Sequence, residues 1–206
     1  MKVDQANQKD KMANILFKLD AIKFGVFKLS SGKASPYYVD LRVIPSFPDA
    51  YRQICEAYAE FIASQVGTKS FDRIAGVPLT GIIFASQIAY NLKKPFLYVR
   101  KGARLSGRER RVEGVLVSGD RVLLVDDLVT TGLTLKKAAE AVRAEGGVVA
   151  DAVVFIDREE GGGQQLEKGG IKLHPMLKIS EMASSLYESG ALDQEGVKTI
   201  FKQVKK

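Results

Sequence analysis

The chain has 206 residues, 31 Lys and Arg, 24 Asp and Glu, and a formal net charge of +7. Its single Cys and single His exclude a disulfide framework and any zinc site that needs several of these ligands. It contains no run of about 18 apolar residues, and its polar N-terminus lacks the apolar core of a signal peptide, so we expect a cytoplasmic protein without a membrane partner. The positive charge is compatible with a nucleic acid, an anionic small substrate or simple solubility.

The N-terminal third of the chain is predicted to combine two helices with a turn-rich segment. Apolar residues at helical spacing predict a helix over 10–23. Short apolar pieces between Ser, Gly and Pro predict one or two short strands within 24–42. A second helix is expected to begin at Pro48 and to end near Gly67.

Strands and helices alternate from residue 73 onwards. We expect strands over 73–78, 95–100, 112–117, 121–127, 148–158 and within 171–177. We expect helices over 80–93, 133–145, 179–189 and 193–202, and a loop over 159–165. This alternation predicts an α/β fold with a mostly parallel central sheet flanked by helices. One domain is expected over 1–206, with its core over about 70–160 and a flanking subdomain formed by about 1–45 and C-terminal segments.

The segment VLLVDDLVTTGLT, residues 122–134, carries the strongest chemical signal. Asp126 and Asp127 end an apolar strand, and ligands of parallel sheets lie beyond the carboxyl ends of the strands. The Thr-Thr-Gly turn that follows opens a helix, where backbone N–H groups and hydroxyls suit a phosphate. Paired carboxylates suit ribose hydroxyls or Mg²⁺ held through water. The segment therefore predicts a ribose-phosphate site, although helix capping alone is an alternative explanation.

The same segment resembles the phosphoribosyl-pyrophosphate signature of the type I phosphoribosyltransferases. Four further segments resemble orotate phosphoribosyltransferases. They are FGVFKLSSGKASPYYVDLR (24–42), GVPLTG (76–81), VRKGARLSGRERRVEG (99–114) and FIDREEGG (155–162). The resemblance runs from about residue 20 to about residue 180. It implies the type I phosphoribosyltransferase fold with a small N-terminal hood subdomain, and transfer of a phosphoribosyl group to orotate in pyrimidine biosynthesis, with Mg²⁺.

The resemblance also implies how the donor, 5-phosphoribosyl 1-diphosphate, is bound. Asp126 and Asp127 would hold its ribose hydroxyls, and Thr80, with Leu79, would contact its diphosphate. The residues that would cradle its 5-phosphate are Thr130, Thr131, Gly132 and Thr134. Mg²⁺ would be held mainly by the diphosphate and the ribose hydroxyls, with both Asp side chains nearby and no direct protein ligand.

Further roles concern the base and the leaving group. Arg158 would pair with the carboxylate of the pyrimidine, because a planar guanidinium can form two parallel hydrogen bonds. The residues expected near the base are Tyr37, Tyr38, Ser30, Ser31 and Lys33. The diphosphate would be reached by Arg100, Lys101 and Arg104, the last two across the interface of a homodimer. The catalytic candidates are Arg104, Lys101 and Asp127.

Most of the net charge lies in one segment, residues 100–111. Its one acidic residue is Glu109, and its basic residues are Arg100, Lys101, Arg104, Arg108, Arg110 and Arg111. This clustering favours a small, multiply charged phosphate substrate over a nucleic acid. The family usually has Lys at the positions of Arg104 and Ser30, and often His at that of Ser106. The effect of these replacements and the identity of the proton donor remain open.

Two alternatives remain open on the sequence alone. One is a purine phosphoribosyltransferase, because RKGAR (100–104) also resembles the basic loop of the adenine enzymes. The other is a regulator with a phosphoribosyltransferase-like fold that binds the donor or a nucleotide and acts on nucleic acid. The net charge of +7 and the replaced loop Lys motivate this second alternative.

Overall fold

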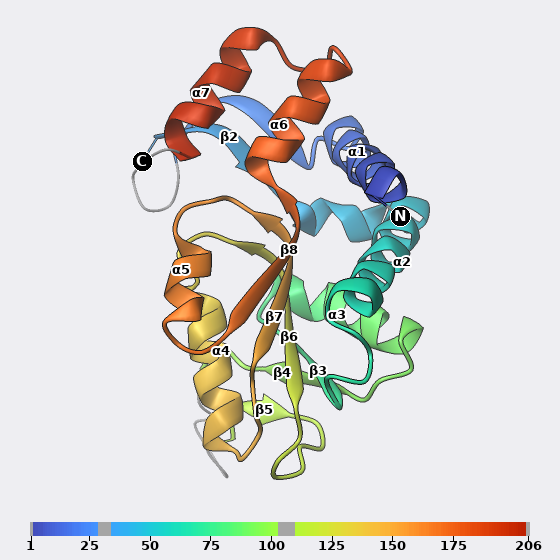
Figure 1. Ribbon diagram of the computed structural model, residues 1–206, viewed down its shortest axis with the longest axis vertical. Coiled ribbons are helices and arrows are strands. Elements are labelled where there is room, and N and C mark those ends of the chain that lie inside the picture. Colours follow the sequence, from blue (N-terminus) through green and yellow to red (C-terminus); the bar gives the residue numbers. More distant parts are fainter. Residues whose placement is uncertain (1, 29–33, 103–109, 205–206) are drawn as a thin grey trace. The chain divides into compact units, whose positions relative to one another are not determined.

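The computed structural model describes residues 2–28, 34–102 and 110–204 (Figure 1). The chain divides into two compact units. The smaller unit comprises Met1–Ile54, Arg158–Glu160 and Leu177–Lys206. The larger unit comprises Cys55–Asp157 and Gly161–Met176. That the whole chain acts as one domain with a hood and a core stays a prediction.

The larger unit is built on a six-stranded sheet, in which the expected mostly parallel arrangement is confirmed. Its strands, in spatial order, are β5 (Val112–Glu113), β4 (Phe96–Val99), β3 (Arg73–Gly76), β6 (Val122–Val129), β7 (Asp151–Asp157) and β8 (Lys172–Lys178). Strand β3 pairs in parallel with β4 and β6, and β6 pairs in parallel with β7. Only the short β5 pairs antiparallel, with β4, among the pairs of known direction. The carboxyl ends of β3, β6 and β7 therefore share one edge of the sheet.

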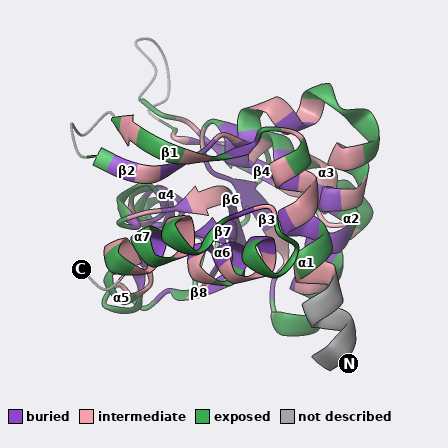
Figure 2. Ribbon diagram, turned by 90° about the horizontal axis from the view of Figure 1, so that it is seen from above, coloured by how far each residue is buried: buried purple, intermediate pink, exposed green. Residues whose placement is uncertain are grey.

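Helices cover both faces of this sheet. They are α2 (Pro48–Gln65, of which the larger unit contains the part from Cys55), α3 (Thr80–Asn91), α4 (Leu133–Ala144) and α5 (Gly162–Glu167). Figure 1 shows α4 and α3 on opposite sides of the strands. Leu135 of α4 and Leu166 of α5 are buried with Leu97 and Leu124 of the sheet in one apolar cluster. Figure 2 shows the buried residues concentrated along β3, β6 and β7, as expected for strands covered on both faces.

The smaller unit contains a two-stranded sheet and three helices, together with the first turns of α2. Its elements are α1 (Lys2–Lys18), β1 (Ile22–Lys28), β2 (Ala34–Val39), a 3-10 helix (Leu41–Ser46), α6 (Ile179–Glu188) and α7 (Gln194–Val204). Strands β1 and β2 pair antiparallel, so the one or two strands expected within 24–42 are two, the first of which begins at Ile22. The ammonium of Lys9 lies 2.9 Å from the carboxylate of Glu181 and thereby joins α1 to α6.

Several predicted boundaries are wrong. The helix expected over 10–23 ends at Lys18, because Asp20 adopts a positive φ of 54° and the chain enters β1 at Ile22. The strand expected over 112–117 stops at Glu113, because Gly114 has a φ of 107° that no extended strand allows. The loop expected over 159–165 contains the start of α5.

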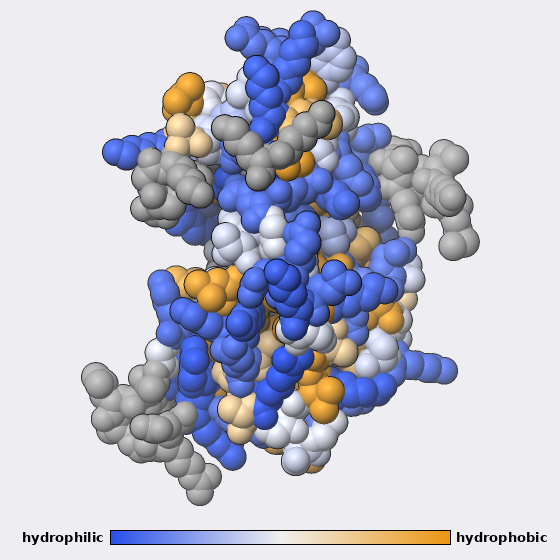
Figure 3. Space-filling view, turned by 60° about the vertical axis from the view of Figure 1, so that its left-hand side comes forward, coloured by the Kyte–Doolittle hydropathy of each residue, from blue (hydrophilic) through white to orange (hydrophobic). Residues whose placement is uncertain are grey.

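The exposed surface is mixed in character. Figure 3 shows one face of the molecule, on which hydrophilic residues predominate and hydrophobic residues form small separate groups. No helix in the described part of the chain has the length and hydropathy that crossing a membrane requires.

Candidate functional site

Strand β6 extends further than its neighbour β3, and the two predicted carboxylates lie in this extension. The last residue of β3, Gly76, pairs with Val125, and Asp126 and Asp127 follow. The Asp127 N–H donates to Asp126 Oδ1 at 2.9 Å, and the Leu128 N–H donates to Asp127 Oδ1 at 2.9 Å. Each carboxylate is thus oriented through one oxygen, and Asp127 is only half-buried. Asp127 therefore presents an acceptor oxygen at the sheet edge where ligands bind.

Asp126 occupies a much drier environment than Asp127. It is 5% exposed, and burial, together with the negative charge of Asp127, raises its pKa well above the usual value of a carboxyl group. Its backbone carbonyl accepts a hydrogen bond of 2.9 Å from the hydroxyl of Tyr58 on α2. The Tyr58 ring packs on Phe155 of β7, with 5.6 Å between ring centroids. Tyr58 therefore fixes the peptide that carries both carboxylates.

The turn after β6 has the shape of a phosphate cradle. Gly132 adopts a left-handed conformation, with a φ of 77°, immediately before α4. Gly132, at the N-cap of α4, has no side chain to cap the helix, so within the described residues the backbone N–H groups of its first turn lack an N-cap acceptor. Thr130 is half-buried, and Thr131 and Thr134 are exposed. The three hydroxyls and the free helix N-terminus together suit a phosphate dianion.

The second predicted phosphate segment lies at the start of α3. A cis peptide bond joins Pro78 to Leu79, and Thr80 begins the helix. Leu79 is 70% exposed, whereas Thr80 is buried. A Cβ atom on Gly81 would lie 2.5 Å from Asp126 Oδ1 and 2.8 Å from Asp126 Cα. The absence of a side chain at Gly81 therefore lets α3 begin directly against the carboxylate of Asp126.

The basic segment is described only at its two stems. The Arg100 N–H donates to the Arg111 carbonyl at 2.8 Å, and the Arg100 guanidinium lies 3.3 Å from the carboxylate of Glu113. Glu145, at the end of α4, accepts hydrogen bonds from the backbone N–H groups of Arg111 and Val112 at 2.9 and 3.0 Å. Lys101 is exposed. Arg104, with Ser106 and Arg108, lies outside the described residues.

A second set of predicted residues meets in the smaller unit, around Arg158. Arg158 is 6% exposed, and its guanidinium lies over the ring of Tyr37, 4.7 Å from the centroid. Arg158 Nε donates to Glu160 at 2.9 Å, and a longer contact of 3.4 Å joins Arg158 to the hydroxyl of Ser35. Gln203 of α7 contacts the same Glu160 oxygen at 3.4 Å. Arg158 is thus a desolvated cation with a fixed orientation.

The two predicted tyrosines differ in environment. Burial raises the pKa of Tyr37 to about 12, although the cation of Arg158 opposes this shift. The Tyr37 hydroxyl is buried and finds no hydrogen-bond partner within the described part of the chain. Tyr38 lies on the other face of β2, where its hydroxyl accepts a hydrogen bond of 3.0 Å from Arg42. Ser30, Ser31 and Lys33 lie outside the described residues.

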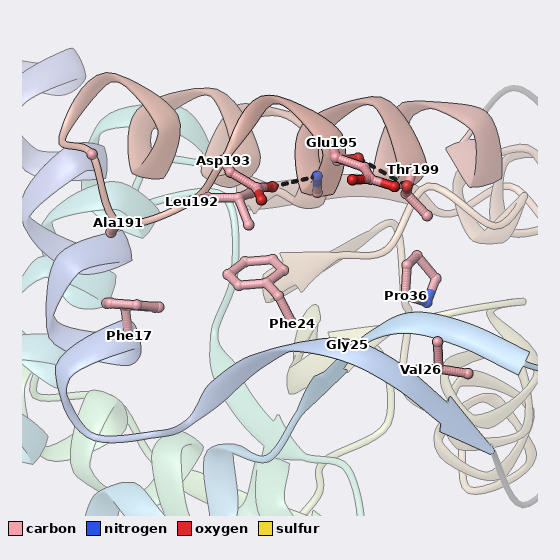
Figure 4. Close-up of a pocket in the computed structure, with 12 residues that line it drawn as sticks. Phe17, Phe24, Gly25, Val26, Pro36, Ala191, Leu192, Asp193, Glu195 and Thr199 are labelled. Atoms are coloured by element: carbon pink, nitrogen blue, oxygen red, sulfur yellow. Dashed lines mark hydrogen bonds between the residues drawn. The ribbon is translucent and has the colours of Figure 1, made fainter.

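The smaller unit also contains a pocket with a volume of about 730 Å³, which is lined by a different set of residues. Figure 4 shows Phe24 of β1 and Leu192 in its wall, with Asp193, Glu195 and Thr199 at the start of α7. The Asp193 carboxylate caps this helix by accepting the Gly196 N–H at 2.7 Å. No residue that the sequence predicts for the site lines this pocket in the described part of the chain.

Four residues to which the sequence assigned no role support the residues around Asp126 and those around Arg158. Tyr58 and Gly81 hold Asp126, Glu160 orients Arg158, and Gly162 packs on the cradle. Tyr58 was indistinguishable in sequence from the other apolar residues on its helix face. The run of three glycines at 161–163 was a signal, since glycines often mark a close backbone approach. Without the fold, its partner could not be inferred.

The chain is similar to known proteins in both sequence and structure. Residues 49–172 match the family model of the phosphoribosyl transferase domain. The chain is 42% identical to the orotate phosphoribosyltransferase of Cenarchaeum symbiosum over 183 residues, which cover 89% of this chain and 92% of that protein. The crystal structure of orotate phosphoribosyltransferase from Aeropyrum pernix superimposes with a TM-score of 0.73 and 32% identity, covering 87% of this chain and 99% of that one.

A third relative is relevant to the ligand. The Mycobacterium tuberculosis orotate phosphoribosyltransferase in complex with 5-phospho-alpha-D-ribosyl 1-diphosphate superimposes with a TM-score of 0.67 and 26% identity. The match covers 85% of this chain and 98% of that one. Sequence and structure comparisons thus agree on one family over most of the chain.

Proposed function

Because this chain belongs to the orotate phosphoribosyltransferase family, we propose that it transfers the phosphoribosyl group of 5-phosphoribosyl 1-diphosphate to orotate. The products are orotidine 5-monophosphate and diphosphate, as in the synthesis of UMP. The observation that carries this proposal is the end of β6, where Asp126 and Asp127 lead directly into the left-handed Gly132 and the uncapped start of α4.

The donor is proposed to bind along the larger unit. The carboxylates of Asp126 and Asp127 accept hydrogen bonds from the ribose hydroxyls, and the half-buried Asp127 does so with its outward oxygen. The 5-phosphate sits at the N-terminus of α4, bound by backbone N–H groups, with hydroxyls supplied by Thr130, Thr131 and Thr134. The backbone around Leu79 and Thr80 contacts the diphosphate at the start of α3.

The acceptor is proposed to bind at Arg158. Its Nε is occupied by Glu160, and one terminal nitrogen makes only the 3.4 Å contact with Ser35, so the terminal nitrogens are the proposed donors to the carboxylate of orotate. Such a charge-assisted pair is strong where the guanidinium is already desolvated and held in place. The fully buried Tyr37 ring supports the guanidinium, and the exposed Tyr38, on the other face of the same strand, is the tyrosine proposed to lie near the base.

Mg²⁺ is proposed to accompany the donor. In the described part of the chain, no group of three or more His, Cys, Asp or Glu side chains forms a metal cage. The two neighbouring carboxylates of Asp126 and Asp127 fit Mg²⁺, because this ion is usually held by one or two carboxylates together with substrate phosphates and water. Asp127 and, behind it, Asp126 are the carboxylates that would lie beside it. Mg²⁺ would neutralise part of the charge that develops on the diphosphate.

The reaction breaks the bond between carbon 1 of the ribose and the diphosphate oxygen, and forms a bond from that carbon to a ring nitrogen of orotate. That nitrogen loses its proton, which the departing diphosphate or solvent takes up. Positive charge develops on the ribose ring while negative charge collects on the departing diphosphate. Arg100 and Lys101, with Arg104 in the basic segment, are proposed to stabilise the departing charge. Exclusion of water during this step protects the ribosyl cation from hydrolysis.

Two further proposals concern the assembly and the compartment. We propose a homodimer in which Lys101 and Arg104 of one subunit act on the site of the other. The exposed side chains of Ile83 and Tyr90 on α3 and Tyr98 on β4 support an interface on the larger unit. A cytoplasmic location accords with the substrates. Sedimentation of the protein with and without the donor tests the dimer.

Following orotate consumption by its ultraviolet absorbance, with the donor and Mg²⁺ present, tests the proposed function. We expect turnover with orotate and none with adenine, hypoxanthine or uracil as the acceptor. Absence of orotate turnover would contradict the proposal, and turnover with adenine alone would indicate a purine enzyme.

A further inference from the structure

Two glycines from different segments touch behind the phosphate cradle. Gly132 closes the cradle, and Gly162 begins α5, which lies beside α4 (Figure 1). A Cβ atom on Gly162 would lie 2.6 Å from the carbonyl oxygen of Thr130 and 2.6 Å from Val129 Cγ2. It would also lie 3.3 Å from the Gly132 nitrogen. Real Cβ atoms essentially never lie within 3.0 Å of such neighbours, so this approach requires a residue without a side chain.

The contact is equally close from the other side. A Cβ atom on Gly132 would lie 2.9 Å from the carbonyl oxygen of Gly162 and 3.2 Å from Leu166 Cγ. The main chains of the cradle and of α5 therefore touch without intervening side chains. Because the closest atoms are mostly backbone, a side chain rotation cannot relieve a clash at Gly162.

The two partners differ in how firmly they are held. Leu166 anchors α5, since it is fully buried in the apolar cluster that contains Val129 and Leu135. Thr131, in the cradle, is exposed and follows the last residue pair of the β6–β7 ladder, Val129 with Asp157. A side chain added at Gly162 would therefore force α5 and the cradle apart and shift the backbone of Thr130 and Gly132.

We propose that Gly162 is a positioning residue for the 5-phosphate of the donor, acting through the backbone of Thr130 and Gly132. The inference rests on the proposed function, because it takes the turn at 130–134 as the phosphate cradle. It assigns to the donor a residue whose sequence segment, FIDREEGG, resembles the part of the family associated with orotate. Gly162 would thus fix the cradle from behind without touching the substrate.

The test compares Gly162→Ala with Gly163→Ala. Gly163 is the matched control, because a Cβ there would meet only Leu173 Cδ2, at 3.8 Å, an ordinary contact. Calorimetry with ribose 5-phosphate probes the cradle, and calorimetry with inorganic diphosphate and Mg²⁺ probes the segment at Leu79–Thr80. We expect Gly162→Ala to weaken ribose 5-phosphate binding, and to raise the KM for the donor, by about tenfold or more, because small misplacements of a binding group are costly.

Diphosphate affinity should stay unchanged in Gly162→Ala, and Gly163→Ala should match the wild type in both assays. Ribose 5-phosphate binding within twofold of the wild type would overturn the inference. An equal loss of diphosphate affinity would also overturn it, since it would indicate general damage.

Hydrogen exchange on the wild-type chain decides the matter if Gly162→Ala does not fold. Ribose 5-phosphate should slow exchange in both 130–136 and 162–167, whereas unchanged exchange in 162–167 overturns the inference. The outcomes for the proposed function are distinct. If the wild type consumes orotate and Gly162→Ala keeps its donor affinity, the inference about Gly162 is wrong and the proposed function stands. If the wild type binds ribose 5-phosphate in a manner that depends on Gly162 but does not consume orotate, the proposed function is wrong and the inference stands.

Discussion

The proposed donor and acceptor residues are assembled in different ways. On the donor side, strand, carboxylates, cradle and helix follow one another within residues 122–144 of the larger unit. On the acceptor side, Arg158 meets Ser35, which is 123 positions away in the sequence, and the ring of Tyr37. A contiguous strand, turn and helix fixes its own geometry, whereas the acceptor residues depend on how distant segments of the smaller unit pack. The two sides should therefore respond differently to substitution.

The largest effect is expected on the donor side, at Asp127. Replacing Asp127 with Asn keeps the shape of the side chain and removes its charge. Loss of charge-assisted hydrogen bonds, each worth about 1.5–3 kcal/mol, should weaken donor binding by about 100-fold. Calorimetry with the donor and Mg²⁺ measures this, with orotate affinity as the internal control. Unchanged donor affinity would contradict the assignment of Asp127 to the ribose hydroxyls.

Asp126 should show the same loss of donor binding together with a change in stability that Asp127 does not show. Burial raises the pKa of Asp126, so the folded chain favours its protonated form. The stabilising contribution of this carboxyl is therefore present at acid pH and is lost as the pH rises through the folded pKa. Asp126→Asn should melt at a higher temperature than the wild type at pH 8, with a smaller difference at pH 5. Equal melting temperatures at pH 8 would contradict this account.

On the acceptor side, Arg158→Lys separates charge from geometry. Lysine keeps the positive charge but cannot form two parallel hydrogen bonds with a carboxylate. The KM for orotate should rise by about 30-fold, the equivalent of about 2 kcal/mol, while the KM for the donor changes little. Arg52→Lys is the matched control, because Arg52 belongs to the same unit and its side chain is 61% exposed. A rise in the KM for both substrates would indicate that Arg158 acts on the fold and not on the base.

This contrast explains how much could be predicted from the sequence. The strand that carries Asp126 and Asp127, and the helix that begins at Leu133, are local patterns of hydrophobicity and turn residues, and the structure has both. The elements that follow Arg158 in the sequence could be predicted less well. Residues 159–165 were expected to form a loop, but α5 begins there at Gly162, because glycine-rich sequence signals a turn more strongly than a short helix.

Contacts between segments could not be predicted from the sequence, for a different reason. The hydrogen bond from Tyr58 to the Asp126 carbonyl joins residues 68 positions apart. The hydrogen bond from Arg158 to Glu160 spans only two positions, yet both residues could equally have faced solvent. Apolar spacing predicts which face of α2 is buried, but it does not reveal that a hydroxyl on that face meets the Asp126 carbonyl of β6.

The smallest effect is expected at Tyr58, which tests whether even the contiguous donor side needs distant support. Tyr58→Phe leaves the ring against Phe155 and removes the donor of the 2.9 Å hydrogen bond to the Asp126 carbonyl. Loss of this buried hydrogen bond should lower the free energy of unfolding by about 1–2 kcal/mol. The peptide that carries both carboxylates loses its anchor, so the KM for the donor should rise by about fivefold, with orotate affinity unchanged.

Phe155→Leu provides the comparison that separates anchoring from packing. It keeps the Tyr58 hydroxyl and removes the aromatic ring whose centroid lies 5.6 Å from that of the Tyr58 ring. Its free energy of unfolding should fall by about 1–2 kcal/mol, like that of Tyr58→Phe, while its KM for the donor stays at the wild-type value. If Phe155→Leu raises the KM for the donor as much as Tyr58→Phe does, then the core under β6 acts as a whole. The donor side would then depend on tertiary packing as much as the acceptor side does.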